Sequence, residues 1–156
     1  MLKRVLKEKV NTYMLFTKFR LSVLVILSAI SGYLFVGGSN FLELIYLFVG
    51  GFLVTAASNG SNQILEREVD ALMKRTEKRP LPRGTISLKE AYTIVVISLI
   101  LGLFILYAIN LYSLLLGLLA YVIYVFLYTP MKSRSSWAVF IGAIPGAIPP
   151  MLGAIA

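Results

Sequence analysis

Residues 62–84 read NQILEREVDALMKRTEKRPLPRG and form the most polar stretch of the sequence. They contain four of the seven acidic residues and six of the fifteen basic ones, and they lie between long apolar runs. With 58% hydrophobic residues, 14% charged residues and a mean hydropathy of +0.84, the 156-residue chain lies outside the range of soluble globular proteins. The sequence therefore predicts a membrane protein in which this stretch is a polar connection.

The apolar runs predict an all-α transmembrane helix bundle without strands, because lipid forces the backbone groups of each span to pair internally. Each run is long enough to cross a hydrocarbon layer of roughly 30 Å as a helix. The expected spans are about five and cover residues 20–38, 41–60, 91–109, 111–129 and 137–156. We assign all of them to one membrane domain, residues 1–156.

Residues 1–16 are expected to form an amphipathic helix at the membrane surface. Lysines alternate there with apolar side chains at helical spacing, namely Val5, Leu6, Val10, Tyr13 and Met14. No small-residue cleavage site follows this basic start, so we expect the first span to remain as an anchor and not to be removed as a signal peptide.

The basic residues predict the orientation of the chain. All fifteen fall within residues 1–20, 59–90 and 132–134. These three segments share one side of the membrane when the spans alternate, and the positive-inside rule identifies that side as cytoplasmic. We therefore expect a protein of the cytoplasmic (inner) membrane whose N-terminus and 59–90 connection are cytoplasmic. The net charge of +8 then reflects topology and not the binding of nucleic acid.

The long connection is expected to begin as a helix. Residues 61–75, SNQILEREVDALMKR, contain no Gly or Pro, whereas RPLPRG at 79–84 ends any helix. Ser87, with Glu90 three residues later, predicts a capping box at the start of the next helix. In the last span, three prolines and a Gly142-x-x-x-Gly146 pair predict a kinked and closely packed helix.

Within the connection, Asn62, Glu66 and Asp70 recur every four residues and so face one way on a helix. Two carboxylates and an amide oxygen suit a hard cation such as Mg²⁺, which also binds phosphate oxygens. The bases that follow suit a bound diphosphate; they are Lys74, Arg75, Lys78 and Arg79. The stretch fits a solvated helix face with ion pairs equally well, and the spacing leaves both interpretations open.

The chain contains no cysteine and no histidine. Within these residues, that composition excludes disulfides, thiol nucleophiles, zinc sites built on Cys or His, and imidazole acid–base catalysis. Any metal bound by these residues must therefore have oxygen ligands.

The pattern N-x-x-x-E-x-x-x-D-A-L-M-x-R-T-x-x-R-P-L-P-x-G at residues 62–84 resembles the first polar motif of the UbiA-type intramembrane prenyltransferases. Its detail is similar to the branch of protoheme IX farnesyltransferases. Further agreement comes from TKFRLSVLVILSAISGYL at 17–34, from YTPMKSRSSWAVFIGAIPGAIPP at 128–150, and from Tyr128-x-x-x-Lys132 within it. The resemblance covers nearly the whole chain.

This resemblance implies a site and a reaction. Asn62, Glu66 and Asp70 would be the catalytic residues and would hold Mg²⁺. The diphosphate of farnesyl diphosphate would be bound by Arg20, Lys74, Arg75, Arg79, Tyr128 and Lys132, with Lys18 as a further candidate. The farnesyl group would then be transferred, in an apolar pocket, to a vinyl group of haem b, giving haem o.

The sequence departs from the family pattern in several places. Gln63 replaces the first aspartate of the general motif, Glu66 replaces the second, and Phe19 stands where many relatives have Pro. Family members have about nine spans and a second acidic motif in their later half, so the resemblance covers the first half of that fold. A second half-chain or a homo-oligomer would complete it. The alternatives are a UbiA-type aromatic prenyltransferase of quinone synthesis and a non-catalytic membrane protein of binding or transport.

Overall fold

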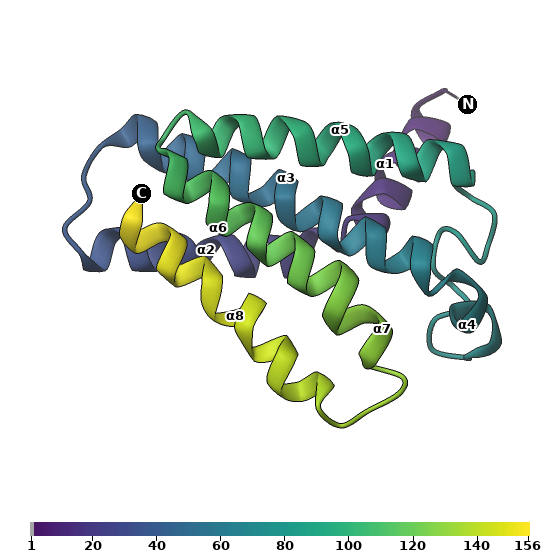
Figure 1. Ribbon diagram of the computed structural model, residues 1–156. Coiled ribbons are helices and arrows are strands. Elements are labelled where there is room, and N and C mark those ends of the chain that lie inside the picture. Colours follow the sequence, from purple (N-terminus) through teal and green to yellow (C-terminus); the bar gives the residue numbers. More distant parts are fainter. Residues whose placement is uncertain (1) are drawn as a thin grey trace.

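The computed structural model describes residues 2–156, apart from the side chains of residues 2, 4 and 5. Over that range the chain is all-helical and contains no strand. The elements in chain order are α1 (Leu2–Phe16), α2 (Phe19–Phe35), α3 (Phe41–Leu65), α4 (Arg67–Leu72), α5 (Leu88–Tyr107), α6 (Leu111–Val122), the π-helical η1 (Ile123–Tyr128), α7 (Thr129–Met131) and α8 (Ala138–Ile155). Figure 1 shows the long helices gathered in one bundle. The predicted all-α class is confirmed.

Four helical segments are long and apolar enough to cross a membrane, namely Phe41–Leu65, Leu88–Tyr107, Leu111–Met131 and Ala138–Ile155. A fifth crossing results if Leu6–Phe16 and Phe19–Phe35, which meet at a bend of 53°, form one broken span. These findings confirm a polytopic helical bundle with about five spans. The sides on which the connections lie stay a prediction.

The first helix, α1, is separated from α2 by the bend. Leu6, Val10 and Met14 are exposed on it, while the Tyr13 hydroxyl donates a hydrogen bond to Glu90 at the start of α5. The side chain of Val5, a residue of the predicted apolar face of this helix, lies outside the described residues. The location of α1 on the membrane surface stays a prediction.

The long helix α3 lies at the centre of the packing. Two clusters of buried apolar side chains hold it against its neighbours. The first comprises Phe16, Ala57, Ile64, Ile86, Ala91 and Val95, and the second comprises Ala29, Tyr33, Leu47, Val54, Leu106 and Leu152. The first cluster joins α3 to α5 and to the end of α1. It therefore fixes the elements around the polar connection.

The last helix, α8, packs closely against α2, as the glycines and prolines of its sequence predict, but through different residues. A Cβ atom at Gly32 or at Gly153 would overlap a backbone carbonyl of the partner helix. Gly142 instead faces the ring of Tyr128, and nothing lies within 4 Å of the Cβ position at Gly146. The Gly142–Gly146 pair is therefore not the contact that brings the two helices together.

The 59–90 connection is less helical than expected. The chain is interrupted at Glu66, α4 ends at Leu72, and Met73 has an extended backbone with φ −104° and ψ 122°. The prediction of a helix through residue 75 is therefore wrong at its end. The Thr76 hydroxyl donates to the carbonyl oxygen of Asp70 at 3.0 Å, and so satisfies a carbonyl in the last turn of α4. Figure 1 shows α4 and the turns after it at the end of the bundle opposite the C-terminus.

Candidate functional site

The helical path continues across the interruption at Glu66, which keeps three polar side chains on one face. The Glu66 amide donates to the carbonyl of Asn62 at 3.0 Å, and the Asp70 amide donates to the carbonyl of Glu66 at 2.7 Å. Asn62 lies in the last turn of α3, Glu66 lies between α3 and α4, and Asp70 belongs to α4. We call these three residues the acidic face.

Asn62 is fixed at the acidic face by both of its side-chain atoms. Its Nδ2 donates to Glu66 Oε2 at 2.9 Å, and its Oδ1 accepts a hydrogen bond from Thr129 Oγ1 at 3.1 Å. The same Thr129 Oγ1 lies 2.8 Å from the carbonyl oxygen of Tyr124, so its one hydroxyl hydrogen is shared between these two acceptors. Since an amide oxygen has two lone pairs, Asn62 Oδ1 keeps one that is free to bind a cation.

Two cations from distant parts of the chain meet the carboxylates. Arg79 Nη1 forms an ion pair with Asp70 Oδ2 and lies 3.7 Å from Glu66 Oε2. Lys132 Nζ lies 3.2 Å from Glu66 Oε1. The Asp70 carboxylate is almost completely buried, so it needs such a partner. Thr76 connects Arg79 to α4. Its hydroxyl binds the Asp70 carbonyl, and its own carbonyl accepts a hydrogen bond from the Arg79 amide at 2.9 Å, so the chain after α4 turns back and brings Arg79 to the carboxylates.

The acidic face has the donor atoms for a hard metal ion. Among the described residues, no group of three or more His, Cys, Asp or Glu side chains is arranged to hold a metal. The acidic face offers two carboxylates and an amide oxygen instead, and both carboxylates approach the same nitrogen of Arg79. A cationic group thus already lies where the two carboxylates converge. This donor set fits Mg²⁺, which takes one or two carboxylates and completes its coordination with water and phosphate oxygens.

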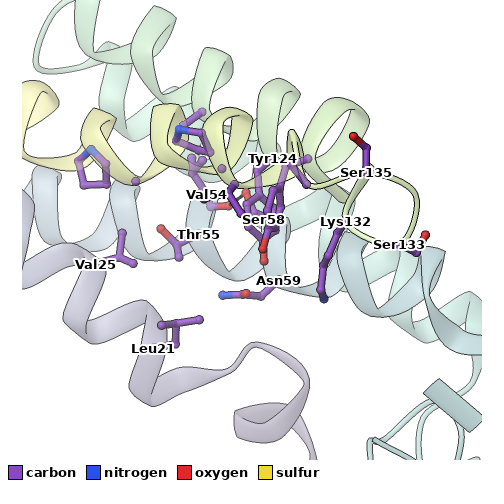
Figure 2. A pocket seen from close by; sticks show the side chains of 18 of the residues that line it. Leu21, Val25, Val54, Thr55, Ser58, Asn59, Tyr124, Lys132, Ser133 and Ser135 are labelled. Atoms are coloured by element: carbon purple, nitrogen blue, oxygen red, sulfur yellow. Dashed lines mark hydrogen bonds between the residues drawn. The ribbon is translucent and has the colours of Figure 1, made fainter. Parts of the chain in front are cut away.

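A cavity of about 820 Å³ lies beside the acidic face, between α2, α3, η1 and α8. Figure 2 shows Leu21 and Val25 of α2 across the cavity from Val54 and Thr55 of α3. Its wall is mainly apolar, and Lys132 lies at the end of the cavity where Glu66 is its ion-pair partner. The cavity and the acidic face therefore meet at Lys132.

Of the other residues predicted to bind a diphosphate, one lines the cavity and three are exposed. Tyr128 lines the cavity and packs against Tyr124, with ring centroids 5.3 Å apart. Lys74, Arg75 and Arg20 are exposed and form no ion pair with the acidic face. The structure thus brings Arg79 and Lys132 together with the carboxylates. A role in diphosphate binding stays a prediction for the entire set.

Lys18 is the cation of the first helical region that faces the acidic face. It lies in the break between α1 and α2 and is half-buried. The Lys18 ammonium interacts electrostatically with the positive charges of Arg79 and Lys132 and with the carboxylates of Glu66 and Asp70. Lys18 is therefore a residue of the TKFR segment that shares the electrostatics of this site.

Sequence reasoning missed the hydroxyl groups that organise the site. Thr76 and Thr129 are both buried, and each donates hydrogen bonds that position a residue of the acidic face or its partner. Their signal in the sequence is weak, because a threonine beside a basic residue or a proline is common in any connection. Only their burial and hydrogen-bond partners distinguish them.

The chain is similar in sequence to known proteins of one family. A sequence model of the UbiA prenyltransferase family matches residues 24–156. The protoheme IX farnesyltransferase of Christiangramia forsetii is 46% identical over 142 residues, which are 90% of this chain and 47% of the relative. That of Cytophaga hutchinsonii is 47% identical over 149 residues, 94% of this chain and 52% of the relative. The chain thus spans about half the length of the curated relatives that it matches.

Two solved structures have the same fold over about half of their length. A digeranylgeranylglyceryl phosphate synthase matches with a TM-score of 0.86 and 28% identity, over 94% of this chain and 52% of that one. A UbiA homolog from Archaeoglobus fulgidus, bound to GPP and Mg²⁺, matches with a TM-score of 0.79 and 22% identity, over 92% and 53%. The membrane-spanning helices and the sequence of the present chain lead to one conclusion: this integral membrane chain belongs to the UbiA prenyltransferase family.

Proposed function

We propose that this chain is part of a protoheme IX farnesyltransferase. In this proposal the protein transfers the farnesyl group of farnesyl diphosphate to a vinyl group of haem b and so forms haem o. It lies in the cytoplasmic membrane with the acidic face on the cytoplasmic side. The choice of haem as acceptor rests on the relatives of that name at 46% and 47% identity, which match about 90% of the chain.

One observation carries the proposed chemistry: Glu66 and Asp70 converge on a single nitrogen of Arg79, next to the apolar cavity that Lys132 borders. Two carboxylates beside two cations suit the binding of a metal diphosphate. The cavity suits an isoprenoid tail, because its wall is mainly apolar. A prenyl diphosphate has both of these parts, with its reacting carbon at their junction.

Mg²⁺ would be held by Asn62, Glu66 and Asp70. When bound, it would neutralise charge on the diphosphate and make it a better leaving group. A relative of the same fold binds GPP together with Mg²⁺, which supports this assignment. Arg79 and Lys132 would turn from the carboxylates to the diphosphate oxygens as the metal takes their place.

The transfer requires no nucleophile from the enzyme. The bond between C1 of the farnesyl group and the diphosphate oxygen breaks, and the diphosphate leaves with the electron pair. The vinyl group of haem b supplies the electrons for the new carbon–carbon bond to C1. Water then adds to the remaining vinyl carbon and loses a proton, which gives the hydroxyethylfarnesyl side chain. The apolar cavity wall would keep water from the allylic cation before the carbon–carbon bond forms.

A chimera tests the proposal. Residues 1–156 would replace the matching half of the Cytophaga hutchinsonii relative, in cells that lack their own enzyme, and extracted pigments would be separated by chromatography. We expect haem o in these cells and in cells carrying the intact relative. Prenylation of an added aromatic or glyceryl phosphate acceptor, without haem o, would contradict the assignment of haem as the acceptor.

A further inference from the structure

We propose that Asn59 and Gln63 are positioning residues that act through Lys18. From α3 they hold the break between α1 and α2, so that the Lys18 ammonium faces the acidic face and binds the diphosphate group of a prenyl diphosphate. The diphosphate part of this inference rests on the proposed function, whereas the hold on the break is a property of this chain by itself.

Gln63 closes the end of α1. It is almost completely buried, and its Nε2 donates to the carbonyl oxygens of Phe16 at 2.7 Å and Leu15 at 3.2 Å. Carbonyls in the last turn of a helix have no partner within that helix. Only the NH₂ end of the amide can pair with two carbonyl oxygens, so the orientation of Gln63 follows from its partners. The aspartate of the general family motif could not make these bonds while ionised.

Asn59, one turn earlier on α3, holds the residues that follow. Its Nδ2 donates to the carbonyl oxygen of Thr17 at 3.4 Å and to Ser22 Oγ at 3.2 Å. The Ser22 hydroxyl in turn donates to the same Thr17 carbonyl at 2.9 Å. Together with Gln63, Asn59 therefore fastens the backbone carbonyls of residues 15–17 to α3. These bonds span more than forty residues of sequence.

The fastened break ends in a strained residue. Lys18 has φ 47° and ψ 52°, and it is the only residue other than glycine with positive φ among residues 2–156. Such a conformation is unfavourable for a side chain with a Cβ and persists where the surroundings impose it. The bonds from Asn59 and Gln63 impose it here. The resulting direction brings the ammonium within the electrostatic reach of Glu66, Asp70, Arg79 and Lys132.

The residues of α3 that hold the break and those that form the acidic face point in different directions. Gln63 points toward α1, while its neighbour Asn62 points toward Glu66 and Thr129. A change of Gln63 therefore removes no group from the acidic face. Its effect on ligand binding should reach the site only through the break and Lys18.

The experiment is a double-mutant cycle on the 156-residue chain in lipid nanodiscs. The variants are Gln63→Met, Lys18→Ala and the two combined. Met has nearly the volume of Gln and removes a buried Oε1 that has no hydrogen-bond partner among the described residues, so packing is retained. The probe is farnesyl thiodiphosphate with Mg²⁺, measured by calorimetry. Ser61→Ala is the matched control, because it removes a partly buried hydrogen bond from α3 to Tyr121 on another side of the helix.

We expect Gln63→Met and Lys18→Ala each to weaken binding of the probe about tenfold, and the double variant to bind no more weakly than Lys18→Ala. Ser61→Ala should bind as the unmodified chain does. Additive losses in the double variant, or unchanged binding by Gln63→Met, would overturn the proposed action through Lys18.

Hydrogen exchange of the amides of residues 17–22 separates this inference from the proposed function, because it needs no ligand. Exchange there should rise in Gln63→Met and in Asn59→Ala but not in Ser61→Ala. Unchanged exchange would show that these residues do not hold the break. If the unmodified chain did not bind the probe, the proposed function and the role of Lys18 would both be rejected, and the exchange result would still decide whether α3 holds the break.

Discussion

At the scale of single residues, Arg79 decides how the acidic face behaves without a ligand. Its Nη1 is shared between the carboxylates of Glu66 and Asp70, so under the proposed function it lies where the metal ion would bind. A guanidinium cannot lose its charge at neutral pH, and it would therefore compete with that metal under all ordinary conditions. The same group can bind diphosphate oxygens once it is displaced.

Replacement of Arg79 should accordingly have opposite effects on two ligands. In Arg79→Gln we expect Mg²⁺ alone to bind several-fold more tightly, because a competing positive charge is removed. Farnesyl thiodiphosphate with Mg²⁺ should bind about tenfold more weakly, because a charge-assisted partner is lost. Calorimetry measures both, with the exposed Arg83→Gln as control. A change of the same sign for both ligands would contradict the proposed exchange of partners.

Asp70 allows a test of the metal assignment in the active chimera. Asp70→Asn keeps the volume of a buried side chain but removes its charge, so we expect haem o formation to fall about 100-fold or more while membrane insertion is unchanged. Glu68→Gln, on the same helix, changes an exposed acid that pairs with Arg67 at 3.3 Å, and it should leave turnover intact. Equal turnover in the two variants would favour the solvated helix face.

The acidic face could be predicted because a spacing of four residues on a helix needs no knowledge of the rest of the fold. Its partners could not. Whether Arg79 or Lys74 reaches Asp70 depends on the turn that Thr76 fastens, and that bond competes with helix propensity over residues 73–75. The approach of Lys132 to Glu66 depends on how η1 packs beside α3. Distances across 66 residues of sequence are set by tertiary packing, which no local pattern records.

At the scale of elements, the apolar runs were sufficient to predict the long helices, because each must satisfy its own backbone in lipid. The contact between α2 and α8 was not predictable in the same way. A glycine in a membrane helix permits close approach only if it faces a neighbour, and the facing residues follow from the rotation of the helix. In the structure Gly32 and Gly153 face the partner helix, whereas a Cβ atom at Gly146 would meet nothing within 4 Å.

Alanine substitutions at Gly153 and Gly146 should therefore distinguish the effect of helix packing on stability from the effect of helix propensity. Gly153→Ala is expected to lower the free energy of unfolding by about 1–3 kcal/mol, because the methyl group would overlap the backbone of α2. Gly146→Ala, on the same helix, should leave it unchanged or raise it by up to about 1 kcal/mol, since alanine is the better helix former. Denaturation in detergent measures both. Equal losses would mean that α8 does not approach α2 through Gly153.

At the scale of the whole molecule, the absence of cysteine from the sequence makes the predicted topology directly testable. Ser39, between α2 and α3, and Ser136, between α7 and α8, are both exposed. The predicted topology places these two connections on opposite sides of the membrane. A cysteine at Ser39 should react with a membrane-impermeant maleimide in intact cells, and one at Ser136 only after permeabilisation. The reverse pattern would place the acidic face outside and reject the cytoplasmic assignment.

The extent of the site sets the last expectation. None of the residues lining the cavity is acidic, so under the proposed function the carboxylates for a metal diphosphate are those of Glu66 and Asp70, beside the cavity. The curated relatives are about twice as long, and the family resemblance implies a second acidic motif in their later half. Without that half, part of the wall that must keep water from an allylic cation is missing.

We therefore expect residues 1–156 to insert into the membrane and bind farnesyl thiodiphosphate without forming haem o. Co-expression with the remaining half of the Cytophaga hutchinsonii relative should restore haem o, measured by pigment extraction. Haem o from the purified chain with Mg²⁺, farnesyl diphosphate and haem b would contradict this expectation, and cross-linking would then decide whether a second copy supplies the missing wall.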